Sequence, residues 1–159
     1  MSRSVIRGFV PSAFRDARER VGMSRGDLVR LAGIADEGTP RRWELGQACP
    51  QIDVLRRALA AINREAEQKQ LAPVGVCEVI VTDAATRYLS DWRHLALLTQ
   101  PELGRAVGLA TSKITRLERG QVALGRGDAA RLAAALGIDA DEVVRAWERA
   151  RARPAGALA

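Results

Sequence analysis

The sequence predicts an all-α protein built from two similar helical units. The first observation is residues 93–120, where apolar residues recur at the three- and four-residue spacing of a helix and glycines stand at both expected helix ends. The second is that residues 18–46 repeat the same order of residue types. A repeat of this kind in a chain of 159 residues favours two small domains over a single one.

The later stretch is expected to contain two short helices joined by a tight turn. Thr99 is a natural N-cap for the first helix, and Glu102 is its partner in a capping box. Ile114 and Leu117 are three residues apart, which gives the second helix an inward stripe. Gly108 lies between the helices and can adopt the positive φ that such a turn needs. These features predict a helix-turn-helix.

The earlier stretch, residues 18–46, follows the same order with larger departures. One residue is inserted between its turn glycine and the glutamate of its second helix, relative to the later stretch. Pro40 falls at the inward position of that helix and suits only a first turn. We therefore expect a lengthened acidic turn over residues 35–38, followed by a short second helix that begins at Thr39 and Pro40.

A set of positions in the later stretch matches one family pattern. The matching residues are Arg93, Thr99, Gln100, Leu103, Gly108, Leu109, Ile114, Leu117, Glu118 and Gly120. Together they resemble the Cro/repressor (XRE) class of helix-turn-helix domains. Gly104 and Ala110 depart from that pattern, where the class usually has alanine and often has a serine or threonine cap. The resemblance implies two tandem lambda-repressor-like five-helix domains, with buried ion pairs between Arg93 and Glu118 and between Arg18 and Glu44.

The resemblance also implies which residues face duplex DNA. In this class the first helix of the pair lays its N-terminus on phosphate and the second enters the major groove. Carried over to this chain, the DNA-binding residues are Gln100, Thr111, Ser112, Lys113, Thr115, Arg116 and Arg119 in the second unit, and Arg25, Thr39, Arg41 and Arg42 in the first. Asp36 and Glu37 would be repelled by phosphate unless one accepts a hydrogen bond from a cytosine, so the second unit is expected to be the better reader of bases.

We expect the chain to divide into five segments. They are an N-terminal arm at 1–10, a first Cro/repressor-type domain at 11–62, a linker at 63–84, a second such domain at 85–153 and a tail at 154–159. The run 76–81 is the only strongly β-favouring one, so a short β-strand is expected, if at all, in the linker. Its backbone groups need a partner. The alternatives are residues 4–10, or the same strand of a second chain in a homodimer.

The amino-acid composition limits the classes of function that this protein can have. The net charge is +6 and only two of the 25 cationic residues are lysines, a balance that suits phosphate contact. Cys49 and Cys77 lack metal-binding spacing and are expected to be free thiols. His94 is the only histidine, and no nucleophile motif or phosphate loop appears. We therefore expect no enzyme activity, no metal site and no cofactor.

The sequence has no apolar run long enough to cross a membrane and no signal-peptide core at its start. We therefore expect a cytoplasmic, nucleoid-associated protein. The predicted function is a sequence-specific double-stranded DNA-binding transcriptional regulator that acts as a repressor. The alternative is a protein-interaction module in which one or both units bind another protein, favoured by the broken second helix of the first unit and by the strand without an evident partner.

Overall fold

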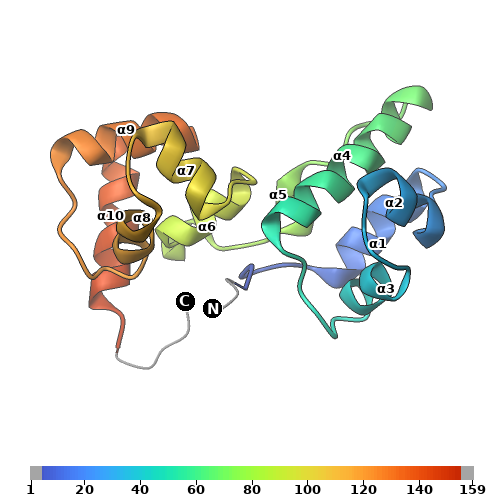
Figure 1. Ribbon diagram of the computed structural model, residues 1–159, viewed down its shortest axis with the longest axis horizontal. Helices are drawn as coiled ribbons and strands as arrows, with labels where there is room; N and C mark the ends of the chain where they lie inside the picture. Colours follow the sequence, from blue (N-terminus) through green and yellow to red (C-terminus); the bar gives the residue numbers. More distant parts are fainter. Residues whose placement is uncertain (1–4, 155–159) are drawn as a thin grey trace. The chain divides into compact units, whose positions relative to one another are not determined.

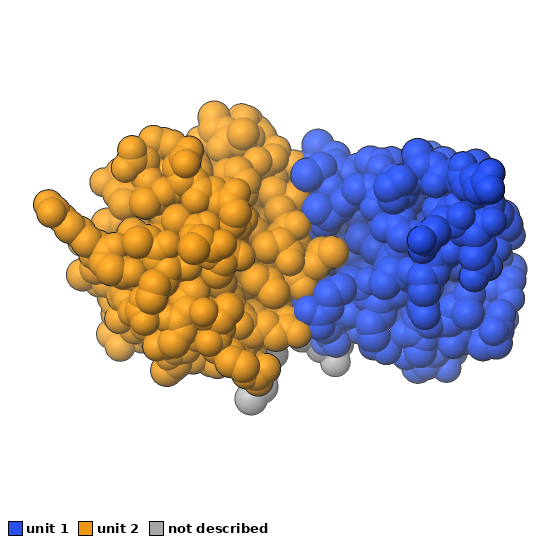
Figure 2. All heavy atoms as spheres, turned by 90° about the horizontal axis from the view of Figure 1, so that it is seen from above, with its two compact units in different colours: residues 1–81 blue, residues 82–159 orange. Residues whose placement is uncertain are grey.

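The computed structural model describes residues 5–154, and the chain divides into two compact units, residues 1–81 and 82–159 (Figure 2). Within residues 5–154 the regular structure is helical, apart from one isolated β-bridge. The predicted all-α fold class is therefore confirmed. No helix of the described residues is both long and apolar enough to span a membrane.

Unit 1 consists of four short helices and one long one (Figure 1). Its helices are α1 (Pro11–Arg20), α2 (Arg25–Ala32), α3 (Gly38–Glu44), α4 (Ile52–Gln68) and α5 (Val76–Val79). The long α4 lies along α2 and carries a continuous apolar face. Phe14, Leu28 and Leu55 are fully buried in the core of this unit, and the ring of Phe14 meets the edge of Trp43 at 5.8 Å between centroids. Burial of such side chains contributes about 1.5–3 kcal/mol each.

The expected strand at 76–81 is wrong for its first four residues, which form the helical turn α5. The carboxylate of Glu78 accepts a hydrogen bond from the N–H of Gly75 at 2.7 Å, and this cap starts a helical turn where side-chain type alone favours a strand. Only Ile80 forms a β-bridge, antiparallel to Phe9. The local cap therefore outweighs the weak β-propensity of a short run.

The partner of this segment lies in the same chain. Val10 donates its N–H to the carbonyl of Val79 at 2.9 Å, and Val81 donates to the carbonyl of Gly8 at 2.8 Å. Of the two alternatives for the partner, the structure uses the N-terminal segment. A homodimer through residues 76–81 stays a prediction, although Val79 and Val81 already use these backbone groups within the chain. Residues 1–4 of the expected arm lie outside the described residues.

Residues 63–81 are part of unit 1 and differ from the expected linker. Residues 63–68 continue α4, and Asn63 holds the returning chain by accepting from the N–H of Val74 at 2.7 Å and donating to its carbonyl at 3.1 Å. Val74, Val79 and Ile80 are buried. The sequence alone indicated a linker here, whereas its few apolar residues pack into the core.

Unit 2 has the 3-10 turn η1 (Ala84–Thr86) and the helices α6 (Leu89–Leu95), α7 (Gln100–Val107), α8 (Thr111–Glu118), α9 (Arg126–Leu136) and α10 (Ala140–Ala152) (Figure 1). Its core includes Leu103, Ile114, Leu117, Leu132 and Val143. The helix α7 packs against α8 and α9, and α10 packs against α6, α8 and α9. Residues 155–159 of the expected tail lie outside the described residues.

Candidate nucleic-acid interface

The helix pair α7–α8 of unit 2 is joined by a tight turn. Thr99 caps α7, because its hydroxyl accepts from the N–H of Glu102 at 3.3 Å while the carboxylate of Glu102 accepts from the N–H of Thr99 at 2.8 Å. Gly108 ends the helix with a φ of 66°. A Cβ placed on Gly104 would stand 2.6 Å from the carbonyl oxygen of Leu109. The departure from the family's alanine at 104 therefore has a steric reason in this turn.

A buried ion pair fixes α8 to α6. The Nε of Arg93 lies 2.6 Å from Oε1 of Glu118, and its Nη2 lies 3.2 Å from Oε2. A third N–H of the same guanidinium donates to the carbonyl of Leu98 at 2.9 Å. Both side chains are buried, so the pair expected from the sequence is present and has the bidentate geometry that suits a low-dielectric site.

Gln100 and Thr115 lie behind the outer surface of the helix pair. The amide of Gln100 donates to Oε2 of Glu118 at 2.7 Å and accepts from the hydroxyl of Thr115 at 3.0 Å. Both residues are half-buried. The resemblance implies that Gln100 and Thr115 belong to the DNA-binding set, with Gln100 supporting base contacts, and in the structure both are linked to the buried ion pair. An amide that donates and accepts at once satisfies both neighbours.

The resemblance implies that Lys113 faces base edges, but in the structure its side chain binds a carboxylate of α9. Its ammonium group lies 2.7 Å from Oδ2 of Asp128, in the first turn of α9. Asp128 has only 11% of its side chain exposed. Hydrogen bonds from Lys113, and then from Arg131, lower the pKa of Asp128 below its ordinary value.

The side chains left on the outer surface of α8 are polar or cationic. Thr111, Ser112, Arg116 and Arg119 are exposed. Within residues 5–154, no side-chain hydrogen bond or ion pair holds Ser112, Arg116 or Arg119. Two guanidinium groups and two hydroxyls are thus free to bind a partner with phosphates and hydrogen-bonding edges.

A family model described as "Helix-turn-helix domain" matches residues 84–154, which span η1 and all five helices of unit 2. The match supports a helix-turn-helix domain in unit 2. Neither the comparison with curated proteins nor the comparison with solved structures found a match. No group of three or more candidate metal ligands is present among the described residues.

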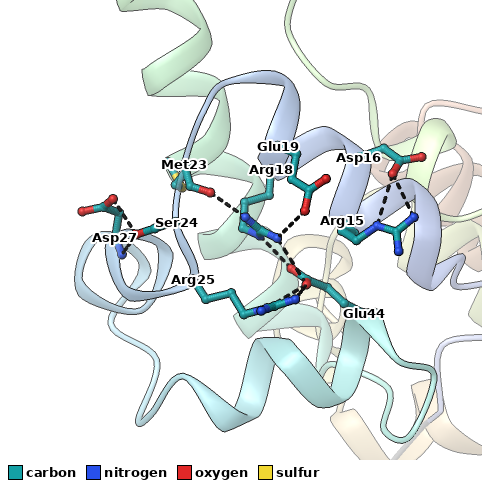
Figure 3. A network of polar contacts seen from close by, with 9 residues as sticks. All are labelled: Arg15, Asp16, Arg18, Glu19, Met23, Ser24, Arg25, Asp27 and Glu44. Carbon is teal, nitrogen blue, oxygen red and sulfur yellow. Dashed lines mark hydrogen bonds and ion pairs between the residues drawn. The ribbon is translucent and has the colours of Figure 1, made fainter.

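Unit 1 contains a helix pair, α2–α3, with the same kind of buried ion pair (Figure 3). The Nε of Arg18 lies 2.7 Å from Oε1 of Glu44, and another N–H of Arg18 donates to the carbonyl of Met23 at 2.6 Å. Arg25, at the position that Gln100 has in unit 2, donates from Nε to Oε2 of Glu44 at 2.8 Å. Burial raises the pKa of Glu44, but hydrogen bonds from both arginines outweigh that effect and lower it overall.

The start of α3 differs from the expectation. The helix begins at Gly38, one residue before the expected cap at Thr39, and its N-cap residue is Glu37, which makes no side-chain capping bond. Asp36 instead accepts from the N–H and hydroxyl of Thr39 at 3.0 and 3.2 Å. Pro40 is buried at the inward position, as expected. Arg41 and Arg42 are exposed.

Two arginines that the sequence did not single out cap the first helix of each pair. Arg131 donates from Nη1 to the carbonyl of Val107 at 2.7 Å, at the end of α7. Arg57 donates to the carbonyls of Ala32 and Gly33 at 2.8 and 2.9 Å, at the end of α2. Each binds carbonyls that have no partner within the helix. The signal was present, since both arginines follow the ion-pair glutamate at the same spacing.

Proposed function

We propose that this chain is a sequence-specific, double-stranded DNA-binding transcriptional regulator of the Cro/repressor type, with unit 1 and unit 2 as tandem helix-turn-helix domains. The observation that carries the proposal is the outer surface of α8, where Ser112, Arg116 and Arg119 are exposed and held by no described residue. That surface belongs to a helix-turn-helix domain whose second helix is fixed by a buried ion pair. Repression is the mode that the resemblance to this class supports.

In the proposed complex α8 enters the major groove and the N-terminus of α7 lies on phosphate. Arg116 reaches O6 and N7 of a guanine together, a pairing worth about 1–3 kcal/mol of discrimination. Thr111 and Ser112 face neighbouring base edges, and Arg119 contacts phosphate. Gln100 and Thr115 support this surface from behind through Glu118.

Unit 1 contributes phosphate contacts in this proposal. Arg41 and Arg42 are exposed on α3, and the carboxylates of Asp36 and Glu37 stand at the start of the same helix. Because phosphate repels these carboxylates, the start of α3 is kept from entering the groove, and Arg41 and Arg42 are expected to contact the backbone and not the bases. Because the two units present different residues, we expect a non-palindromic site for each chain.

Filter binding of the full chain to random duplex DNA at two salt concentrations tests the proposal. Neutralised phosphates give a slope of log affinity against log salt of about −0.9 per contact. A steep negative slope, followed by a defined consensus from selection on a random pool, is the expected result. A flat slope at measurable affinity, or no binding, would contradict DNA binding.

A second candidate function is protein binding by unit 1. Leu45 is 56% exposed at the end of α3, at the position where unit 2 has the cationic Arg119. An apolar side chain beside Arg41 and Arg42 suits a protein partner better than a phosphate backbone. If Leu45→Ala and Arg42→Ala both leave affinity for random DNA and the salt slope unchanged, unit 1 does not contact DNA and this candidate is favoured.

A further inference from the structure

Lys113, Asp128 and Arg131 form a network that joins the three central helices of unit 2. Lys113 on α8 approaches one oxygen of Asp128 at 2.7 Å, and Arg131 on α9 approaches the other oxygen at 2.6 Å. Arg131 also donates to the carbonyl of Val107 at the end of α7. The carboxylate therefore receives two cations, one of which is itself anchored to a third helix.

The burial and location of Asp128 show that this network is part of the folded structure of unit 2. Asp128 as a whole residue is only 9% exposed, and it lies in the first turn of α9, where the helix dipole stabilises negative charge. Buried carboxylates need such partners, because an unpaired charge away from water is costly. Lys113 is 43% exposed at its side chain, so solvent reaches the ammonium but Asp128 sets its direction.

Unit 1 lacks this network. Counted from the ion-pair glutamates, the positions of Lys113 and Asp128 correspond to Thr39 and Val54. Thr39 bonds to Asp36 of its own turn, and valine offers no carboxylate. The network is therefore specific to the unit that presents the exposed surface of α8, and it is not required for the helix pair itself.

We propose that Asp128 is a specificity-determining residue, which holds Lys113 away from the DNA and so limits phosphate contact that is independent of sequence. This inference rests on the proposed DNA-binding function. An unrestrained lysine on α8 adds one phosphate contact to every complex, whether the sequence is correct or not. With Lys113 held by Asp128, discrimination depends on Thr111, Ser112 and Arg116.

The test compares Asp128→Asn, Lys113→Gln and the double variant of the full chain on a selected site and on random duplex DNA. Asp128→Asn keeps the shape of the side chain and releases the ammonium. We expect its affinity for random DNA to rise roughly three- to tenfold at low salt, with the salt slope steeper by about one. The ratio of specific to nonspecific affinity should fall.

Lys113→Gln should leave the slope and the base preference unchanged, and the double variant should behave like Lys113→Gln.

Two outcomes overturn the proposal. If Lys113→Gln weakens binding or flattens preference at a base position, Lys113 contacts DNA and Asp128 does not withhold it. If the effect of Asp128→Asn persists in the double variant, it does not act through Lys113. Circular dichroism melting of each variant checks the fold, and Lys113→Gln alone decides the first point if Asp128→Asn does not fold.

A measurement without DNA separates failure of this inference from failure of the proposed function. Carbon NMR of the Asp128 carboxyl follows its titration in the full chain, and Lys113→Gln should raise its pKa toward the ordinary aspartate range because the first cause of its lowering is removed. An unchanged titration shows that the Lys113 contact is absent in solution and overturns the inference. If the contact is present but the unmutated chain does not bind DNA, the proposed function fails, and the specificity role fails with it.

Discussion

The two helix pairs share a buried ion pair but differ in what surrounds its carboxylate. In unit 2, Glu118 binds one arginine and the amide of Gln100, which in turn accepts from Thr115 on α8. In unit 1, Glu44 binds two arginines, Arg18 and Arg25 (Figure 3). The arginine pair leaves the start of α2 more cationic, whereas the amide connects the ion pair to α8. The arginine–glutamate ion pair is therefore common to both units, whereas the other side chains that bind its carboxylate differ.

The turn between α7 and α8 also differs from the turn between α2 and α3. The shorter turn of unit 2 brings the carbonyl of Leu109 so close to Gly104 that a methyl group does not fit. Unit 1 has one more residue in its turn and Val29 at the equivalent position. The insertion also brings Asp36 to the start of α3. One inserted residue thus relaxes the packing of the turn and adds negative charge to the surface that would approach DNA.

The ion pairs should differ in their contribution to stability. We expect Glu118→Ala to lower the free energy of unfolding of unit 2 by about 3–5 kcal/mol, because Arg93 is buried and Glu118 is its one carboxylate partner among the described residues. Glu44→Ala should cost unit 1 less, since Arg18 keeps Glu19 at 3.1 Å and Arg25 can turn to solvent. Hydrogen exchange resolved along the chain measures both units at once. Equal costs would show that the partners do not determine the difference.

Acid should destabilise unit 2 before unit 1. Burial, and then the neighbouring charge of Arg93, lowers the pKa of His94 to about 4, against an ordinary value of 6.5. The unfolded chain therefore binds the proton more strongly, and stability present above pH 6.5 is lost as the pH falls toward 4. The loss is about 1.4 kcal/mol per pH unit, or about 3 kcal/mol over the window. Unit 1 contains no histidine, so its stability should be nearly constant down to about pH 5, below which protonation of Glu44, whose pKa is lowered in the folded state, begins to reduce it.

Hydrogen exchange of each unit at a series of pH values checks this effect, with His94→Gln as the control variant. The substitution should flatten the pH dependence of unit 2 between pH 6.5 and 4, whatever its cost at neutral pH. A slope that remains in His94→Gln would assign the acid sensitivity to other groups.

Gly104→Ala tests the difference between the two turns. Alanine is the better helix former by about 1 kcal/mol, yet its Cβ would meet a backbone oxygen, so we expect a net destabilisation of about 1–3 kcal/mol. Gly127→Ala in α9 is the matched control, because a Cβ there meets nothing within 4 Å. That variant should be stabilised by about 0.5–1 kcal/mol. Thermal melting measures both, and a stabilised Gly104→Ala would mean that the turn is looser than described.

Much of the scaffold was predictable from local signals. Capping residues, turn glycines and apolar spacing indicated the helices α7 and α8, and the resemblance to the Cro/repressor class implied both ion pairs. These features depend on residues close in sequence, or on a pattern that the chain contains twice. Such signals are strong because propensity, capping and burial agree.

The rest depended on side-chain partners that a linear sequence does not specify. The spacing places Lys113 on the outer side of α8, but only the packing of α9 brings Asp128 within reach. Gln100 turns inward for the same reason, since Glu118 and Thr115 offer it both a donor and an acceptor. The helical turn α5 depends on one carboxylate, that of Glu78, and so its β-favouring side chains misled the prediction.

The central claim is that unit 2 reads bases and unit 1 contacts only the backbone, and it is tested most directly by comparing Arg116→Ala with Arg42→Ala. Both side chains are exposed and occupy equivalent positions relative to the ion-pair glutamates. Each variant of the full chain is measured on a selected site, on its single-base variants and on random duplex DNA at two salt concentrations. We expect Arg116→Ala to remove about 1–3 kcal/mol of preference at one or two base positions. Arg42→Ala should weaken binding to all sequences alike and reduce the salt slope by about one. If Arg42→Ala changes base preference and Arg116→Ala does not, the reading surface lies in unit 1 and the account is wrong.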